Sequence, residues 1–154
     1  MNGDSGVLMG APLAAGLRDH DGQSNHVEVI MIDQQLQSCI DACNACADAC
    51  DFCASSCLRE EDVKMMSACI ALDIDCAAVC RLAAGFVARG SDLAAYICQT
   101  CAEVCQACAD ECGKHQMQHC QDCARACRAC ADQCRQMAGF RGTAHQLATQ
   151  HAAH

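Results

Sequence analysis

The sequence is poor in the residues that usually fill a helical core. Its 154 residues include no Trp, one Tyr and three Phe, and only five leucines lie between residues 36 and 138. Aromatic side chains and Leu bury the most apolar area per residue, so their scarcity excludes an ordinary core of large side chains. The chain has 19 cysteines instead. Cysteine stands where Leu would normally stand.

The sequence also has few basic residues, no long apolar run and no export signal, which limits its possible binding partners and its cellular location. Ten basic residues face 19 acidic ones, and a net charge of −9 disfavours nucleic acid and anionic membrane surfaces. No apolar run approaches the ~20 residues that span a bilayer. An export signal opens with Lys or Arg ahead of its apolar segment. Here the first basic residue is Arg18, which follows the mildly apolar N-terminal residues, and no twin-arginine pair is present. We therefore expect a cytoplasmic protein that binds neither nucleic acid nor membrane.

Cytosolic thiols are kept reduced, so clustered cysteines in such a protein indicate metal binding or catalysis rather than disulfides. The odd number of cysteines also leaves at least one without a partner in any complete disulfide scheme.

The spacing of the cysteines predicts helices. In CIDACNACADACDFCASSC, residues 39–57, the steps between cysteines are 4, 3, 4, 3 and 4, which places all of them on one helix face. We predict three regions: a flexible N-terminal segment over residues 1–25, a metal-binding bundle over 26–138, and a polar tail over 139–154. Glu60 and Glu61 would interrupt the apolar stripe, and Gly90-Ser91-Asp92 provides a stop signal with Ser91 as an N-cap. Gly113 is suited to end the third helix.

Four helices are predicted, each with one inward stripe. The first stripe contains Ile32, Leu36, Cys39, Cys43, Cys46, Cys50, Cys53 and Cys57. The second contains Met65, Cys69, Leu72, Cys76, Cys80, Ala83 and Val87. The third contains Ala94, Cys98, Cys101, Cys105, Cys108 and Cys112, and the fourth contains Cys120, Cys123, Cys127, Cys130, Cys134 and Met137. The short links predict an all-α fold, an antiparallel up-down-up-down four-helix bundle with a cysteine-lined core.

Three interpretations of the cysteines differ in chemistry. Cysteine as a small, inert core residue does not explain why most inward positions are Cys. Redox enzymes place one CxxC at a helix N-terminus, where the thiol pKa is lowered, but here the CxxC pairs recur within helices. Ferredoxin spacing is absent as well. Binding of a soft metal by thiolates fits the stripes best, and all 19 cysteines are candidate ligands.

Charge favours copper over zinc. A zinc ion with four thiolates carries two negative charges, and several such sites would bury charge at a cost of several kcal/mol each. One Cu(I) per thiolate leaves the core neutral, and bridging thiolates allow many ions to pack together. A zinc or cadmium buffer of the metallothionein type stays open as the alternative. The sequence contains no HExxH, no di-iron ExxH, no GxGxxG and no EF-hand loop, so we expect no enzymatic activity.

The sequence resembles the bacterial four-helix-bundle copper storage proteins over about residues 39–134, in the segments CIDACNACADACDFC, CIALDIDCAAVC, CQTCAEVCQACADEC and HCQDCARACRACADQC. The resemblance implies a bundle whose core cysteines bind many Cu(I) ions, and a tetrameric assembly. The family divides into exported and cytosolic forms, and without an export signal this chain resembles the cytosolic form.

The two ends of the predicted bundle differ. Ile32, Leu36, Val87 and Met137 close one end, with Phe86 and Phe140 nearby. The other end holds the two hairpin turns, where weaker Cu(I) ligands lie just outside the outermost cysteines: Met65, His115, Met117 and His119. Thioether and imidazole suit a transient site through which copper enters the core, although isolated His and Met residues at a turn are also commonly only solvated or packed.

Overall fold

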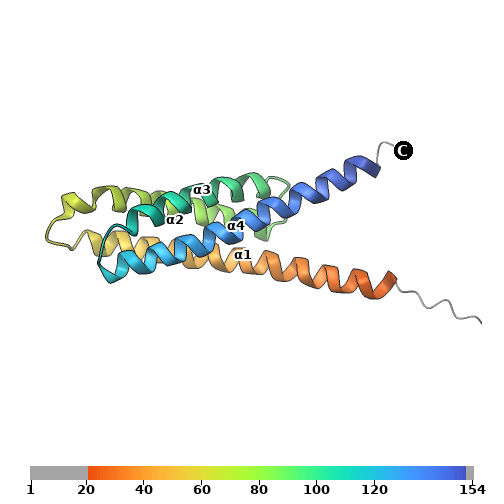
Figure 1. Cartoon of the computed structure of the whole chain (residues 1–154), viewed down its shortest axis with the longest axis horizontal. Coiled ribbons are helices and arrows are strands. Elements are labelled where there is room, and N and C mark those ends of the chain that lie inside the picture. The colour runs from red at the N-terminus through yellow and green to blue at the C-terminus, as the bar shows by residue number, and fades with distance from the viewer. Residues whose placement is uncertain (1–20, 152–154) are drawn as a thin grey trace, which may run out of the picture.

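The structure is a computed structural model that describes residues 21–151, with side chains described from 27 to 139. It contains four long helices, α1 (Asp21–Cys57), α2 (Ser67–Ala88), α3 (Ala94–Cys112) and α4 (Gln118–His151), and a short 3-10 helix, η1 (Val63–Met66). Helix α1 packs against α2 and α4, and α3 packs against the same two helices. The predicted all-α, up-down-up-down bundle is confirmed (Figure 1).

The helix boundaries differ from the predicted regions. Helix α1 already begins at Asp21, and α4 continues past residue 138 to His151. Residues 1–20 of the segment predicted to be flexible lie outside the described residues. The division into three regions stays a prediction.

The break between α1 and α2 falls where the acidic pair predicted it. Helix α1 ends at Cys57, and residues 58–66 form the connection. Within it, the Asp62 carboxylate accepts a hydrogen bond from the Met65 backbone N–H at 3.3 Å and caps η1. A side-chain cap of this kind satisfies a donor that has no partner within the helix.

The other two connections are short. Gly90 ends α2 in the left-handed region, at a φ of 62°, which glycine adopts without steric cost. The prediction that Ser91 is the N-cap of α3 is wrong. Helix α3 begins at Ala94, and Leu93 is its N-cap residue. The Ser91 hydroxyl instead accepts a hydrogen bond from the Leu93 N–H in the turn. Gly113 follows the last residue of α3, as predicted.

The connections place two hairpin turns at one end of the bundle. We call this the hairpin end; it consists of the α1–α2 connection, residues 58–66, and the α3–α4 connection, residues 113–117. The opposite, terminal end carries the α2–α3 connection, and α1 and α4 extend beyond the bundle on that side (Figure 1). Val87 and Met137 are almost fully buried there.

Buried alanines accompany the cysteines on every helix. They recur at heptad spacing, seven residues apart, in four pairs: Ala47 and Ala54, Ala77 and Ala84, Ala102 and Ala109, Ala124 and Ala131. A heptad spacing keeps a residue on the contact face of a helix in a bundle of nearly parallel helices. Because alanine is small, these positions let neighbouring helices approach closely enough for short cysteine side chains to meet.

We predict that a larger side chain at one of these alanines destabilises the apo bundle. Ala109 is fully buried, whereas Ala107 on the same helix is exposed. Ala109→Leu should lower the free energy of unfolding by about 1–3 kcal/mol, because added methylenes do not fit a packed interior. Urea unfolding of the reduced, metal-free protein measures the effect, and Ala107→Leu is the matched control. Equal stabilities of the two variants would contradict the tight alanine contact.

Candidate metal centre

All 19 cysteines point into the bundle. Each has no exposed surface, and each is a free thiol. Helix α1 contributes six, α2 three, α3 five and α4 five. The predicted inward position of every cysteine therefore agrees with the structure.

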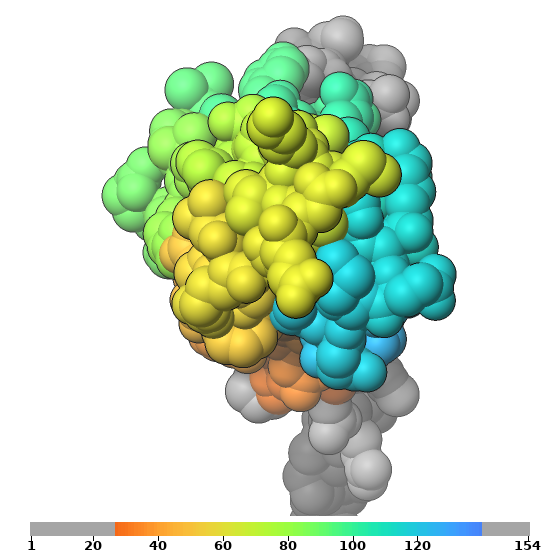
Figure 2. Space-filling view, turned by 90° about the vertical axis from the view of Figure 1, so that its left-hand side faces the viewer, coloured from red at the N-terminus to blue at the C-terminus, as the bar shows by residue number. Residues whose placement is uncertain are grey.

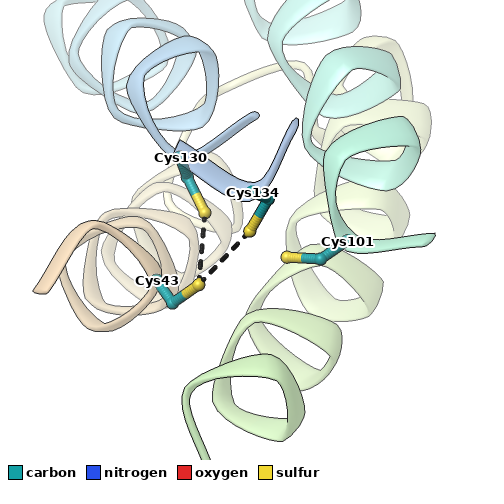
Figure 3. Close-up of side chains that lie close together, drawn as sticks. All are labelled: Cys43, Cys101, Cys130 and Cys134. Atoms are coloured by element: carbon teal, nitrogen blue, oxygen red, sulfur yellow. Dashed lines mark hydrogen bonds between the residues drawn. The ribbon is translucent and has the colours of Figure 1, made fainter. Parts of the chain in front are cut away.

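The sulfur atoms of different helices lie close together. Cys43 Sγ on α1 is 3.5 Å from Cys134 Sγ and 3.7 Å from Cys130 Sγ, both on α4. Figure 3 shows these three thiols turned toward one another, with Cys101 of α3 facing them. Between the neighbouring helices α2 and α3, the sulfurs of Cys69 and Cys112 lie 3.2 Å apart. Such distances allow one metal ion to contact thiols from two or three helices.

The thiols form overlapping groups of four. Several such groups have all four sulfurs within 4.8 Å of one another, among them Cys43, Cys101, Cys130 and Cys134; Cys46, Cys80, Cys105 and Cys130; Cys46, Cys50, Cys76 and Cys127; Cys50, Cys108, Cys123 and Cys127; and Cys53, Cys57, Cys69 and Cys120. Cys46, Cys50, Cys127 and Cys130 each belong to two of these groups. Four of these five groups are thus linked by shared thiols into one series, and the group of Cys53, Cys57, Cys69 and Cys120 lies beyond it toward the hairpin end.

Burial disfavours the charged thiolate form of the core cysteines, whereas hydrogen bonds among the thiols raise the pKa of some of them and lower that of others, such as Cys69 beside Cys112. Burial raises the pKa of Cys57 to about 11, and burial also raises the pKa of Cys120. Both lie toward the hairpin end, at the end of α1 and the beginning of α4. A neutral thiol needs no counter-charge, so the apo core can be closely packed without buried thiolate charges.

A buried carboxyl group lies among the thiols, and the sequence analysis missed it. Asp73 of α2 is completely buried. The thiols of Cys108, Cys112 and Cys123 donate to its Oδ1 at 3.2, 3.3 and 3.2 Å, and Cys69 donates to its Oδ2 at 3.6 Å. Burial raises the pKa of Asp73 to about 8.

Asp73 corrects the predicted face of α2. We expected Leu72 and Met65 inward, but Leu72 is only partly buried and Met65 is 69% exposed. Their neighbours Asp73 and Met66 occupy the inward positions. Counting backward from Cys80 in steps of 4, 3, 4 and 3 reaches Cys76, Asp73, Cys69 and Met66. The alternating steps of three and four residues seen in the other helices therefore identify Asp73 and Met66 as inward positions.

Of the four residues predicted at the copper route, His119 lies against the core thiols. Its Nδ1 is 3.4 Å from the sulfur of Cys120, 3.6 Å from that of Cys53 and 3.8 Å from that of Cys57. Its Nε2 lies 2.9 Å from Oε1 of Glu60 in the α1–α2 connection.

The other three residues of this route are arranged differently. Met117 packs against the core from the α3–α4 connection, whereas Met65 faces solvent. His115 Nε2 is buried and lies 3.7 Å from Glu111 Oε1, beyond hydrogen-bond range. The structure thus brings one of the four side chains into contact with several thiols.

The fold and the linked groups of thiols define a class of protein, a helical bundle that encloses a polythiol core. A model of the copper storage protein family matches residues 32–139, which is most of the chain. This chain belongs to that family.

Individual relatives agree with this assignment. The cysteine-rich protein YhjQ of Bacillus subtilis is 46% identical over 88 residues, which cover 57% of this chain and 82% of YhjQ. The Cu(I)-bound copper storage protein BsCsp3 of Bacillus subtilis is 46% identical, with a TM-score of 0.65, and the match covers 68% of this chain and 98% of that one. A cytosolic copper storage protein from Streptomyces lividans with five coppers is 37% identical, with a TM-score of 0.69 and coverage of 71% and 96%.

Within the part of the chain that the structure describes, no helix is both long enough and apolar enough to cross a membrane.

We predict that Asp73 makes the stability of the apo protein depend on pH. Its folded pKa of about 8 lies above the ordinary value of 3.8, so between these values the folded state binds more protons than the unfolded state. The free energy of unfolding should therefore fall as pH rises from about 5 to 8, by on the order of a few kcal/mol. Asp73→Asn should remove this decline, because an amide does not ionise.

Anaerobic urea unfolding at several pH values, with reductant present, measures this effect. Asp75→Asn is the control, since Asp75 is an exposed carboxylate on the same helix. If Asp73→Asn showed the same decline as the wild type, the buried carboxyl would not be its source.

Proposed function

We propose that this protein is a cytosolic store and buffer for many Cu(I) ions, which bind to thiolates of its 19 core cysteines. The observation that carries the proposal is the sharing of thiols between adjacent groups of four. A shared thiolate can bridge two metal ions, and bridging suits Cu(I), a soft ion that binds few ligands. Relatives described as Cu(I)-bound or copper-loaded support the choice of metal.

Charge supports copper over the zinc or cadmium alternative. Each Cu(I) replaces one thiol proton, so that an S–H bond is exchanged for an S–Cu bond and the proton leaves to solvent. The core then stays neutral however many ions it holds. Tetrahedral zinc sites would each leave two negative charges, and the described residues place no lysine or arginine side chain in the buried core to compensate them.

The resemblance implies a homotetramer, and we include this assembly in the proposal. Exposed apolar side chains on α2 and α3 offer surface for it: Ile74, Leu82 and Tyr96 are between 48% and 74% exposed. Sedimentation equilibrium should give a mass of about four times the 16.3 kDa of one chain. The mass of a monomer at all concentrations would refute the tetramer.

We also propose that copper enters at the hairpin end. Figure 2 views this end and shows the α1–α2 connection lying beside the beginning of α4. Here His119 offers an imidazole nitrogen within 3.8 Å of three thiols. The terminal end is filled by Val87 and by the buried thioether of Met137, and among the residues with described side chains no histidine lies there. Among the four candidate residues, the contacts favour His119 over His115, Met117 and Met65.

The first prediction of this function is capacity. Anaerobic titration with Cu(I) against a competing chelator should reach on the order of one Cu(I) per cysteine, about 19 per chain, because shared thiolates can bridge neighbouring ions. A parallel Zn(II) titration should saturate at about four or five ions, as expected for tetrahedral sites. Saturation with Cu(I) at four or five ions would refute shared thiolates.

The second prediction concerns the route. A variant with His115→Ala, His119→Ala and Met65→Leu should take up the first Cu(I) equivalents more slowly and lose them more slowly to a chelator, with unchanged final capacity. The His119→Ala change alone should account for most of the effect, because of the three substituted residues His119 is the one that contacts several thiols. Stopped-flow mixing with a Cu(I)–chelator complex measures the rates, and Gln116→Ala in the same connection is the control. Wild-type rates in the triple variant would place the route elsewhere.

A further inference from the structure

Glu60 lies between the solvent and His119 at the hairpin end. It belongs to the α1–α2 connection, and its side chain is 37% exposed, whereas that of His119 is 13% exposed. The two residues are 59 positions apart in the sequence. Their contact joins the connection to the first turn of α4.

The contact determines which nitrogen of His119 carries the proton. A carboxylate has no hydrogen to donate, so in the 2.9 Å contact with Glu60 Oε1 the His119 Nε2–H is the donor. In a neutral imidazole the other nitrogen then carries the lone pair, because the hydrogen bond at one nitrogen sets the state of the other. Nδ1 is therefore the atom that can bind a metal.

His119 Nδ1 also faces thiols that can bind the same metal ion. It lies 3.4, 3.6 and 3.8 Å from the sulfurs of Cys120, Cys53 and Cys57. Bonds as long as those of zinc, about 2.3 Å to thiolate sulfur and about 2.0 Å to imidazole nitrogen, place the two donor atoms roughly 3.7 Å apart at a trigonal angle. The apo arrangement already has this separation, so an ion can be bound there with little movement of the side chains.

We propose that Glu60 is a positioning residue for copper uptake: it holds His119 with Nε2 protonated and Nδ1 directed at the three thiols. This inference rests on the proposed route through the hairpin end. Partners that orient a metal-binding histidine through its second nitrogen typically contribute a factor of 10–100 to metal affinity. Glu60 supplies such a partner from a different segment of the chain.

The test separates positioning from a general effect of negative charge. Glu60→Ala removes the acceptor, Glu60→Gln keeps an acceptor oxygen but removes the charge, and Glu61→Ala removes an equal charge from the exposed neighbouring residue. Each variant is made in the full chain and studied in the reduced state without oxygen. His119→Ala serves as the reference for complete loss of the imidazole.

Two measurements are made on each variant. Long-range proton–nitrogen NMR of apo protein labelled with 15N-histidine identifies the tautomer of His119, whose signals are assigned by their loss in His119→Ala. We expect the Nε2–H tautomer alone in the wild type and Glu61→Ala, and a mixture of both tautomers in Glu60→Ala. Stopped-flow transfer of Cu(I) from a bicinchoninate complex should show the first Cu(I) equivalents taken up about tenfold or more slowly in Glu60→Ala. Glu60→Gln should recover most of the lost rate, and the final capacity should not change.

The outcomes distinguish this inference from the proposed route. If His119→Ala slows uptake of the first Cu(I) ions but Glu60→Ala does not, the role of Glu60 is wrong and the route stands. If Glu61→Ala and Glu60→Gln slow uptake as much as Glu60→Ala, the effect is one of charge and positioning is refuted. If His119→Ala takes up the first ions at the wild-type rate, the route is wrong, and the role of Glu60 in uptake is wrong with it.

Discussion

The structure depends on the close approach of thiols from four helices. Sulfur atoms of different helices lie 3.2–4.0 Å apart, although a cysteine side chain extends only one atom beyond Cβ. The helices must therefore be close together, and the heptad alanines make this approach sterically acceptable. A core of larger side chains would separate the sulfurs and remove the shared groups of four on which multiple binding of Cu(I) rests. The scarcity of Leu and aromatic residues is thus a requirement of the site.

The sequence determined the inward face wherever cysteines occupy consecutive steps. In α1, α3 and α4 the steps of three and four leave no choice of face, and every predicted cysteine is buried. Helix α2 has only three cysteines, and both residue 72 and residue 73 lie one step from them. Side-chain polarity favoured Leu72, but the helical phase set by Cys69, Cys76 and Cys80 places Asp73 inside. At Asp73, hydrogen bonds from thiols partly offset the cost of burying a carboxyl group.

The contacts of His119 show what the sequence could not provide. Its position one residue before Cys120 suggested a ligand near the core, and so did the position of His115 three residues after Cys112. Only the fold distinguishes them, because α4 turns His119 toward Cys53 and Cys57 on α1. The contact with Glu60 joins a connection to a different helix, and no local spacing rule relates two such residues. Residues that orient a ligand from another segment are therefore the part of a site that needs a structure.

The shared thiols also indicate how an ion can move within the core. One series of overlapping groups runs from Cys127 and Cys50 through Cys46 to Cys130, and from there to Cys43 and Cys134. Sulfurs in direct contact along it are 3.5–3.7 Å apart, and those of Cys46 and Cys130 lie within 4.8 Å of each other, so a Cu(I) ion can exchange one thiolate at a time without losing all its ligands. Toward the hairpin end, Asp73 accepts hydrogen bonds from Cys69, in the outermost group, and from Cys108 and Cys123, in the next. With Val87 and Met137 filling the terminal end, copper that enters beside His119 would pass this carboxyl group before it reaches the innermost thiols.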